Sequence, residues 1–290
     1  MIVPLNGFDL YYDRDGNGPT IVYVHGGFAT LATYLYSSDD YQWSWEHDFT
    51  PHFDFIEYYR RGCYRSSCPE GGYDLPNQTN DLETLLNYLG LEAVNLIGSS
   101  AGGPISLLFA ATRPERVHSL ILVGTGLNLF PQDDPITQVV KTLLEKMERE
   151  NIEAAFKARP AGVETNFEVL WNMEGEMKER GVLEEYLAGQ QRTTDLATAL
   201  PHQVRLKYYA AELLNMAAYI GFDLVPFAAR VRVPTMVLHG THDRVVPISW
   251  GEELVRNIPE AKLVKIAGGS HSLVIRSAEV RRIIMDFLGN

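Results

Sequence analysis

Cysteine is scarce in this chain of 290 residues, and its two copies, Cys63 and Cys68, lie in one short segment. A secreted domain stapled by disulfides uses many more, so that class is excluded. We expect two free thiols in a reducing compartment, with a local disulfide as the alternative, which would close only a small loop. The segment has no Cys-x-x-Cys pair and no histidine at ligand spacing, so it predicts no zinc site.

Long apolar runs and basic residues are lacking too. No run approaches the ~18 apolar residues of a membrane-spanning helix, and residues 1–10 have neither a basic nor an apolar signal region. The 25 Lys and Arg are outnumbered by 37 Asp and Glu, which gives a formal charge of −12. Such an acidic chain opposes binding to nucleic acid and to anionic membranes. We therefore expect a cytoplasmic protein whose partner is a small-molecule substrate, and which is a monomer or a homodimer.

Short apolar runs alternate with helical patterns at both ends of the chain. This rhythm is typical of βαβ units, whose right-handed crossovers build a mostly parallel sheet. The predicted strands are residues 8–13, 20–24, 53–59, 93–97, 120–123, 235–238 and 263–266. The predicted helices between and after them are residues 79–89, 102–113, 249–256 and 278–288. The fold class is therefore α/β.

Between residues 126 and 230 the pattern becomes almost wholly helical. From Ile136 to Met147, apolar residues recur at i, i+3, i+4, i+7, i+8 and i+11, which is one face of a helix. Residues 204–220 form another helical stretch, and strands resume only after residue 234. We predict a core domain of residues 1–125 and 231–290, interrupted by a helical cap at 126–230, since neither flank alone completes a sheet. A second independent domain is the alternative.

The most informative motif is Gly-Ser-Ser-Ala-Gly at residues 98–102, which follows a predicted buried strand and precedes a predicted helix. A turn this tight crowds its central residue, so Gly98 and Gly102 leave the needed space. The turn lifts the hydroxyl of Ser100 above the edge of the sheet, where the helix N-terminus offers N–H groups to a developing oxyanion. Ser100 is the candidate nucleophile, and an ordinary strand-to-helix turn is the alternative.

A serine nucleophile needs a base and a group that orients the base. Asp243 lies just beyond a predicted strand, and His271 lies in a Gly/Ser loop after the last predicted strand. Because ligands gather at the carboxyl ends of such strands, we expect Asp243 as the acid and His271 as the base. The alternatives are a turn-forming aspartate and a surface histidine. His239 is expected to be buried, and His242 to be a loop residue.

An oxyanion hole needs two N–H donors. The amide of Ala101, directly after the candidate nucleophile, is one of them. Residues 25–28, which we call the oxyanion loop, supply the other, with Gly27 as the first choice and Phe28 as the second. Because Gly26 and Gly27 carry no side chain, the backbone can approach the substrate oxygen there. We expect His25 to support this loop through a hydrogen bond and not to act as the base.

Four segments follow one another along the chain: residues 25–27, the turn around Ser100, and the loops at 240–247 and 269–271. With these segments in this order, the chain resembles the α/β-hydrolase fold family, of the type with a serine nucleophile and a helical cap. The resemblance covers essentially the whole chain. It implies an eight-stranded, mostly parallel sheet flanked by helices and a helical cap inserted after the sixth strand. It also implies no cofactor and a catalytic triad of Ser100, Asp243 and His271.

One segment departs from the family pattern. Relatives often carry Asp-x-Arg-Gly-x-Gly-x-Ser after the fourth strand, whereas this chain has Tyr59 at the acidic position and Tyr64 at a glycine position. The Arg-Gly-Cys core of the segment is similar to that of the prolyl aminopeptidase-like branch. That branch usually has Pro-Gly where this chain has Phe-Ala at 28–29, and Trp where it has Ala101. Branches with an aspartate nucleophile are disfavoured because Ser100 fills that position, and cofactor-free dioxygenase relatives stay open.

Aromatic residues indicate what would bind. One group begins beside the oxyanion loop and either walls a pocket or packs that segment onto the domain: Tyr34, Tyr36, Tyr41, Trp43, Trp45 and Phe49. The predicted cap adds others, most of them expected in its own core: Phe156, Phe167, Trp171, Tyr186, Tyr208, Tyr209 and Tyr219. We predict hydrolysis of a small apolar or aromatic carboxylic ester or lactone through an acyl-enzyme. The alternatives are an amide or peptide bond, a carbon–carbon bond, and a non-catalytic ligand receptor.

Overall fold

The computed structural model describes residues 1–28, 47–161, 163, 167–171, 174–179, 181–271, 273 and 277–289. The first aromatic group therefore lies outside the described residues, except for Phe49. Phe49 is fully buried and stacks on Phe55 with 5.4 Å between the ring centroids. At this one position the aromatic side chain packs its segment onto the sheet and does not wall a pocket.

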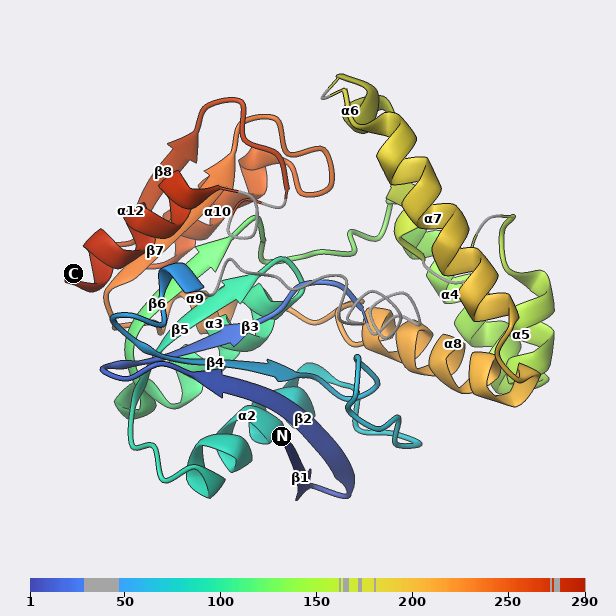
Figure 1. The fold of residues 1–290 in the computed structure, drawn as a ribbon, viewed down its shortest axis with the longest axis horizontal. Coiled ribbons are helices and arrows are strands. Elements are labelled where there is room, and N and C mark those ends of the chain that lie inside the picture. The colour runs from blue at the N-terminus through green and yellow to red at the C-terminus, as the bar shows by residue number, and fades with distance from the viewer. Residues whose placement is uncertain are drawn as a thin grey trace.

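Eight strands form one sheet in the order β1-β2-β4-β3-β5-β6-β7-β8 (Figure 1). Their bounds are β1 Ile2–Leu5, β2 Phe8–Asp15, β3 Thr20–Val24, β4 Asp54–Tyr59, β5 Val94–Ser99, β6 Val117–Val123, β7 Thr235–Gly240 and β8 Lys262–Ile266. The pairs β1–β2 and β2–β4 are antiparallel, and the five pairs from β4 to β8 are parallel. The predicted α/β class with an eight-stranded, mostly parallel sheet is confirmed.

Helices cover both faces of the sheet. Strand residues alternate between the faces, so Val22 and Val24 join one buried cluster while Ile21 and Tyr23 join the other. The first face carries α2 Leu75–Tyr88, α3 Gly102–Thr112, α9 Val225–Ala228 and α10 Ile248–Asn257. The second carries α12 Ala278–Leu288, whose Val280 and Ile284 are fully buried (Figure 1). The short 3-10 helix η2, Pro114–Arg116, leads into β6.

Residues 126–230, which we call the helical segment, lie between β6 and β7. Its elements are α4 Pro135–Arg149, α5 Ile152–Ala158, the 3-10 helix η3 Phe167–Trp171, α6 Glu174–Glu179, α7 Leu183–Thr198, α8 His202–Ala217 and α9. Figure 1 shows α4 to α8 gathered on one side of the molecule, away from α10 and α12. The predicted apolar face of α4 is confirmed, because Val140 and Leu143 are buried.

The helical segment and the sheet share one hydrophobic cluster. Val24 and Leu96 of the sheet and Val140 and Leu213 of the segment all belong to it. Four of the seven aromatic residues predicted for the core of the segment are indeed buried: Phe156, Phe167, Tyr209 and Tyr219. The division into a core domain of 1–125 and 231–290 and a cap of 126–230 stays a prediction.

Two features differ from the sequence expectations. The apolar spacing predicts a helix from residue 79, but α2 begins at Leu75, because the Asp74 side chain caps it by accepting from the Asn77 amide. Strand β1 was not predicted from the residues, since its four-residue alternation is too short to stand out.

Cys63 and Cys68 are both free thiols, so the alternative of a local disulfide is wrong. Among the described residues, none of the helices is long and apolar enough to cross a membrane.

Candidate active site

Three side chains predicted to act together meet at one edge of the sheet. Ser100 follows β5, Asp243 follows β7 and His271 follows β8. These strands are parallel, so their carboxyl ends lie at the same edge. Each side chain stands in the loop directly after its strand, which is where ligands gather in open α/β sheets. The sheet therefore brings together three residues that are up to 171 positions apart in the sequence.

A chain of hydrogen bonds joins the three side chains. Ser100 Oγ lies 3.0 Å from His271 Nε2, and His271 Nδ1 lies 2.8 Å from Asp243 Oδ2. The other carboxylate oxygen, Oδ1, accepts from the amides of Val245 and Val246 at 2.9 and 2.8 Å. These two amides lock the buried carboxylate, which leaves Oδ2 to orient the imidazole. The His271 side chain keeps 18% of its surface exposed, so it is not sealed from solvent.

The backbone at Ser100 is held in a left-handed conformation, with φ of +48°. This geometry is uncommon for a residue with a side chain, and it is the constrained turn that the sequence predicts for the candidate nucleophile. The Ser100 amide donates to Val123 O at 2.9 Å, and its carbonyl accepts from the Gly103 amide and from Thr125 Oγ1. A Cβ atom at Gly102 would lie 2.0 Å from Val24 O, so only glycine fits there. The motif predicted at 98–102 is confirmed as a strand–turn–helix unit.

The oxyanion loop lies directly against Ser100. A Cβ atom at Gly26 would come within 2.9 Å of Ser100 Cβ, so the absence of a side chain permits this contact. Ala101 caps α3, where the first N–H groups of a helix have no carbonyl partner within the helix. The structure thus places the predicted donors Gly27 and Ala101 in the two segments that flank the serine. Phe28 contributes a buried ring that contacts Phe130, Trp171 and Tyr219.

The other histidines near the site do not reach Ser100. His25 lies 2.6 Å through Nδ1 from Gly26 O, as predicted for a loop support. Burial, together with the charge of Arg60, lowers the pKa of His25 to about 3, so the ring stays neutral and is a weak base near neutral pH. His239 is fully buried, as predicted, and burial lowers its pKa as well. His242 is an exposed loop residue beside Thr241.

Two residues beside the site were not predicted to act there: sequence reasoning did not single out Arg60, and it placed Tyr219 only among the aromatic residues of the cap. Arg60 is buried behind the oxyanion loop, and its guanidinium donates to Gly27 O. Tyr219 follows α8, and its hydroxyl donates to Ala101 O at 2.6 Å. Arg60 belongs to the segment that departs from the family pattern. That departure was a feature of the sequence that could have pointed to Arg60. No local pattern marks Tyr219, because its partner is 118 positions away.

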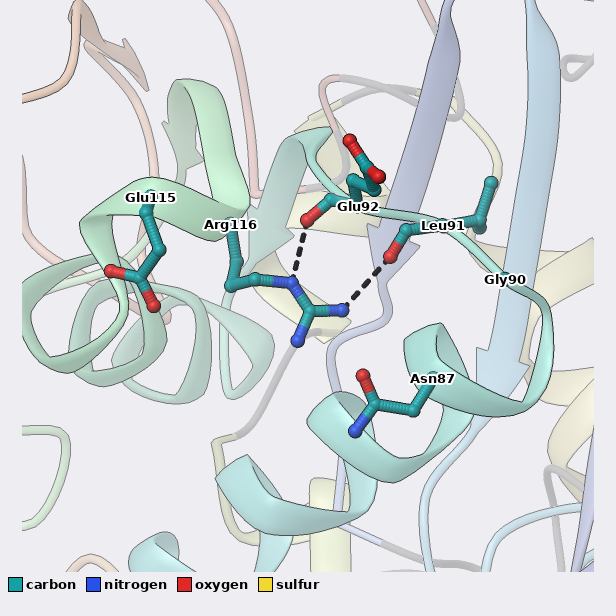
Figure 2. A pocket seen from close by; sticks show the side chains of 6 residues that line it. All are labelled: Asn87, Gly90, Leu91, Glu92, Glu115 and Arg116. Carbon is teal, nitrogen blue, oxygen red and sulfur yellow. Dashed lines mark hydrogen bonds between the residues drawn. The ribbon is translucent and has the colours of Figure 1, made fainter.

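A hollow lies at the other edge of the sheet. Figure 2 shows it at the amino ends of β5 and β6, lined by Asn87, Gly90, Leu91, Glu92, Glu115 and Arg116. The guanidinium of Arg116 is occupied there, because it donates to the carbonyl oxygens of Leu91 and Glu92. The serine, histidine and aspartate lie at the opposite, carboxyl edge, so this hollow is not part of the candidate active site.

Comparison with known proteins finds a matching family model and relatives whose names describe different reactions. A family model described as alpha/beta hydrolase fold matches residues 19–278. The chain is 26% identical to a poly(3-hydroxyalkanoate) depolymerase from Ectopseudomonas oleovorans, over 82% of this chain and 76% of that protein. It is 27% identical to a 2-hydroxy-6-oxo-6-phenylhexa-2,4-dienoate hydrolase from Burkholderia cepacia, over 71% of this chain and 66% of that protein. The crystal structure of the enol-lactonase from Burkholderia xenovorans LB400 covers all of both chains, with a TM-score of 0.68 and 24% identity.

Proposed function

The chain belongs to the α/β-hydrolase fold family, and we propose that it is a serine hydrolase that cleaves a small apolar or aromatic carboxylic ester or lactone. The observation that carries the proposal is the hydrogen-bonded chain from Ser100 through His271 to Asp243. A nucleophile, its base and the group that orients the base are recognised by this geometry and not by their order in the sequence.

The geometry supports a two-step acyl transfer. His271 Nε2 takes the proton of Ser100 Oγ as that oxygen attacks the carbonyl carbon, while Asp243 stabilises the resulting imidazolium. The amides of Gly27 and Ala101 would donate to the oxyanion of the tetrahedral intermediate. The protonated His271 then gives its proton to the alkoxide as the carbon–oxygen bond breaks. The products of this first step are an alcohol and an acyl group bound to Ser100. A water molecule, activated by His271, releases the acid in the second step.

The substrate class is supported by an aromatic cluster between the oxyanion loop and the helical segment. The Phe28 ring stacks on Trp171 at 6.2 Å and meets Phe130 and Tyr219 edge-on at 5.2 and 5.5 Å. Trp171 is only partly buried. Phe28, Phe130 and Tyr219 are buried, so Trp171 is the ring of this cluster that a substrate would contact first. An aromatic surface beside the site favours apolar or aromatic acyl groups over sugars and phosphates. In this proposal the helical segment is the cap over the site, and the relatives named as a lactonase and a depolymerase make ester bonds the first choice.

The test is hydrolysis by the wild type and by Ser100→Ala. The panel comprises p-nitrophenyl acetate, butyrate and octanoate, one lactone and one aminoacyl anilide. Loss of the nucleophile should lower turnover by about 10⁶-fold. Ser99→Ala, in the same turn, is the matched control and should keep most of the activity. Ester turnover in Ser100→Ala close to that of the wild type would refute the serine mechanism.

Carbon–carbon bond hydrolysis is the second candidate. It is favoured by the similarity to the dienoate hydrolase from Burkholderia cepacia, and the same three side chains serve that chemistry. A vinylogous diketone whose absorbance is lost on cleavage separates the two candidates. Rapid cleavage of this compound, with slow turnover of every ester, would replace the ester proposal. Amide hydrolysis would show in the anilide, and binding without turnover would indicate a receptor.

A further inference from the structure

Arg60 is a buried cation that hydrogen-bonds no carboxylate among the described residues. Only 2% of its surface is exposed. Its guanidinium donates to Gly27 O, to Gln78 Oε1 at 3.1 Å and to Tyr219 Oη at 3.2 Å, and its Nε has no partner within the described residues. The neighbouring Arg61, in contrast, forms a buried ion pair with Asp81 at 2.7 Å. Burying a charge without a counter-charge is costly, so this arrangement calls for a role beyond packing.

We propose that Arg60 and Tyr219 are positioning residues that hold both oxyanion-donor segments in place for the reaction proposed above. The proposal rests on the proposed function, because it assigns these residues to the oxyanion hole of that reaction. One arm runs from Arg60 to the oxyanion loop. The other runs from Arg60 through Tyr219 to Ala101.

The first arm fixes two consecutive peptide planes. The guanidinium of Arg60 donates to Gly27 O, while its backbone amide donates to His25 Nε2 at 3.3 Å. Since Nε2 accepts a hydrogen bond, the proton of the neutral imidazole is on Nδ1, which donates to Gly26 O at 2.6 Å. In a trans peptide the N–H points away from the C=O. Anchoring these two carbonyls therefore sets the directions of the Gly27 and Phe28 N–H groups.

The second arm reaches the segment on the other side of Ser100. Tyr219 Oη accepts from Arg60 and donates to Ala101 O at 2.6 Å, so the hydroxyl uses both of its hydrogen-bonding roles. Tyr219 is buried and belongs to the helical segment. The cation is thus two hydrogen bonds from Ala101 and one from Gly27. By the same trans-peptide rule, the Ala101 carbonyl sets the direction of the Gly102 N–H, while the Ala101 N–H shares its peptide plane with Ser100 O, which accepts from the Gly103 amide and from Thr125 Oγ1. The second arm therefore fixes the C-terminal side of Ala101, and a segment held on both sides needs little reorganisation when negative charge develops on the substrate oxygen.

The decisive variant is Tyr219→Phe, which removes one hydroxyl and keeps the ring. We expect kcat for p-nitrophenyl butyrate to fall about tenfold, less than the 10²–10³ of a deleted direct donor, with KM within about twofold. Affinity for an alkylboronic acid, which mimics the tetrahedral intermediate, should fall in parallel with kcat. Arg60→Lys should lose more, because a single ammonium cannot reproduce the planar fork.

Tyr58→Phe is the matched control. Tyr58 is fully buried near Arg60, but its hydroxyl has no hydrogen-bond partner among the described residues. Its removal should leave kcat unchanged. The proposal is overturned if Tyr219→Phe keeps the wild-type kcat, or if Tyr58→Phe loses as much.

A readout without turnover separates this proposal from the proposed function. Nitrogen-15 NMR of the wild-type protein should show His25 neutral and protonated on Nδ1 from pH 5 to 8, whether or not any ester is cleaved. A His25 protonated on Nε2 would overturn the first arm. If that tautomer is as expected and Ser100→Ala retains ester turnover, the proposed function fails while the hydrogen-bonded arrangement stands.

Discussion

At the scale of single residues, the buried imidazole of His25 lies between two backbone groups. Its Nδ1 lies 2.6 Å from Gly26 O, and the Arg60 amide donates to its Nε2 at 3.3 Å. Only 8% of the His25 surface is exposed, so a positive charge on this ring would be poorly solvated.

His25 makes the stability of the fold depend on pH. Its pKa is lowered to about 3, first by burial and then by the charge of Arg60, against an ordinary value near 6.5 in the unfolded chain. Below pH ~6.5 the unfolded state binds a proton that the folded state does not, so the free energy of unfolding falls as pH falls. The stability that comes from burying a neutral His25 is therefore fully present above pH ~6.5 and is lost as the pH falls towards ~3.

We therefore expect His25→Asn to flatten the pH dependence of stability. Between pH 7 and 5 the wild type should lose about 2 kcal/mol more of its unfolding free energy than the variant does. Urea denaturation at the two pH values measures this difference. His242→Gln, at an exposed loop position, is the control and should keep the wild-type slope. Equal slopes for His25→Asn and the wild type would show that His25 is not a neutral buried group.

The positions of the three candidate triad residues could be predicted from the sequence, whereas the hydrogen bonds behind the oxyanion loop could not. Ser100, Asp243 and His271 each stand in a short loop after a strand, so local patterns place them at a known edge of the sheet. Arg60 and Tyr219 are hydrogen-bonded to each other across 159 positions. A side-chain hydrogen bond of that range leaves no periodic pattern in a sequence.

At the scale of elements, the unit from β5 through the serine turn to α3 depends on close backbone contact. Gly102 is the first residue of α3, and inside a helix alanine is ordinarily favoured over glycine by about 1 kcal/mol. A Cβ atom there would lie 2.0 Å from Val24 O and 2.8 Å from His25 O, both backbone atoms that cannot move aside cheaply. The clash should outweigh the gain in helix propensity.

Gly102→Ala is accordingly expected to be less stable than the wild type by about 1–3 kcal/mol, and to lose ester turnover as β3 and the oxyanion loop shift away from Ser100. Thermal unfolding and kcat measure the two effects. Gly71→Ala, where a Cβ atom meets nothing within 4 Å, should change neither. Wild-type stability in Gly102→Ala would mean that the contact with Val24 is looser than the structure shows.

Element types were predictable because apolar periodicity is a local property, whereas several boundaries depend on caps and pairing. α2 begins four residues before its apolar spacing because Asp74 accepts from the Asn77 amide. β1 exists because its backbone pairs with β2, from Ile2 opposite Tyr11 to Leu5 opposite Phe8. A four-residue strand has too few alternations to be recognised without its partner.

At the scale of the whole molecule, the helical segment is held to the sheet by more than its two covalent connections, to β6 and to β7. The shared hydrophobic cluster runs from the strands into α4 and α8. Two buried side chains of the segment also bond backbone carbonyls of the other part: Asn215 reaches Arg61 O at 3.0 Å, and Tyr219 reaches Ala101 O. Cooperative unfolding of both parts follows from such continuous burial.

Leu213→Ala tests whether a change within α8 is felt in α3. Leu213 is fully buried in the shared cluster, so its truncation should cost about 2–5 kcal/mol. Native-state hydrogen exchange should show equal losses of protection for the slowest amides of α8 and of α3, because both exchange through one unfolding event. Leu187→Ala, 43% exposed on α7, is the matched truncation and should change neither helix measurably. If Leu213→Ala lowers protection in α8 alone, the helical segment opens independently of the sheet, and the predicted boundary at residues 126–230 separates two units of stability.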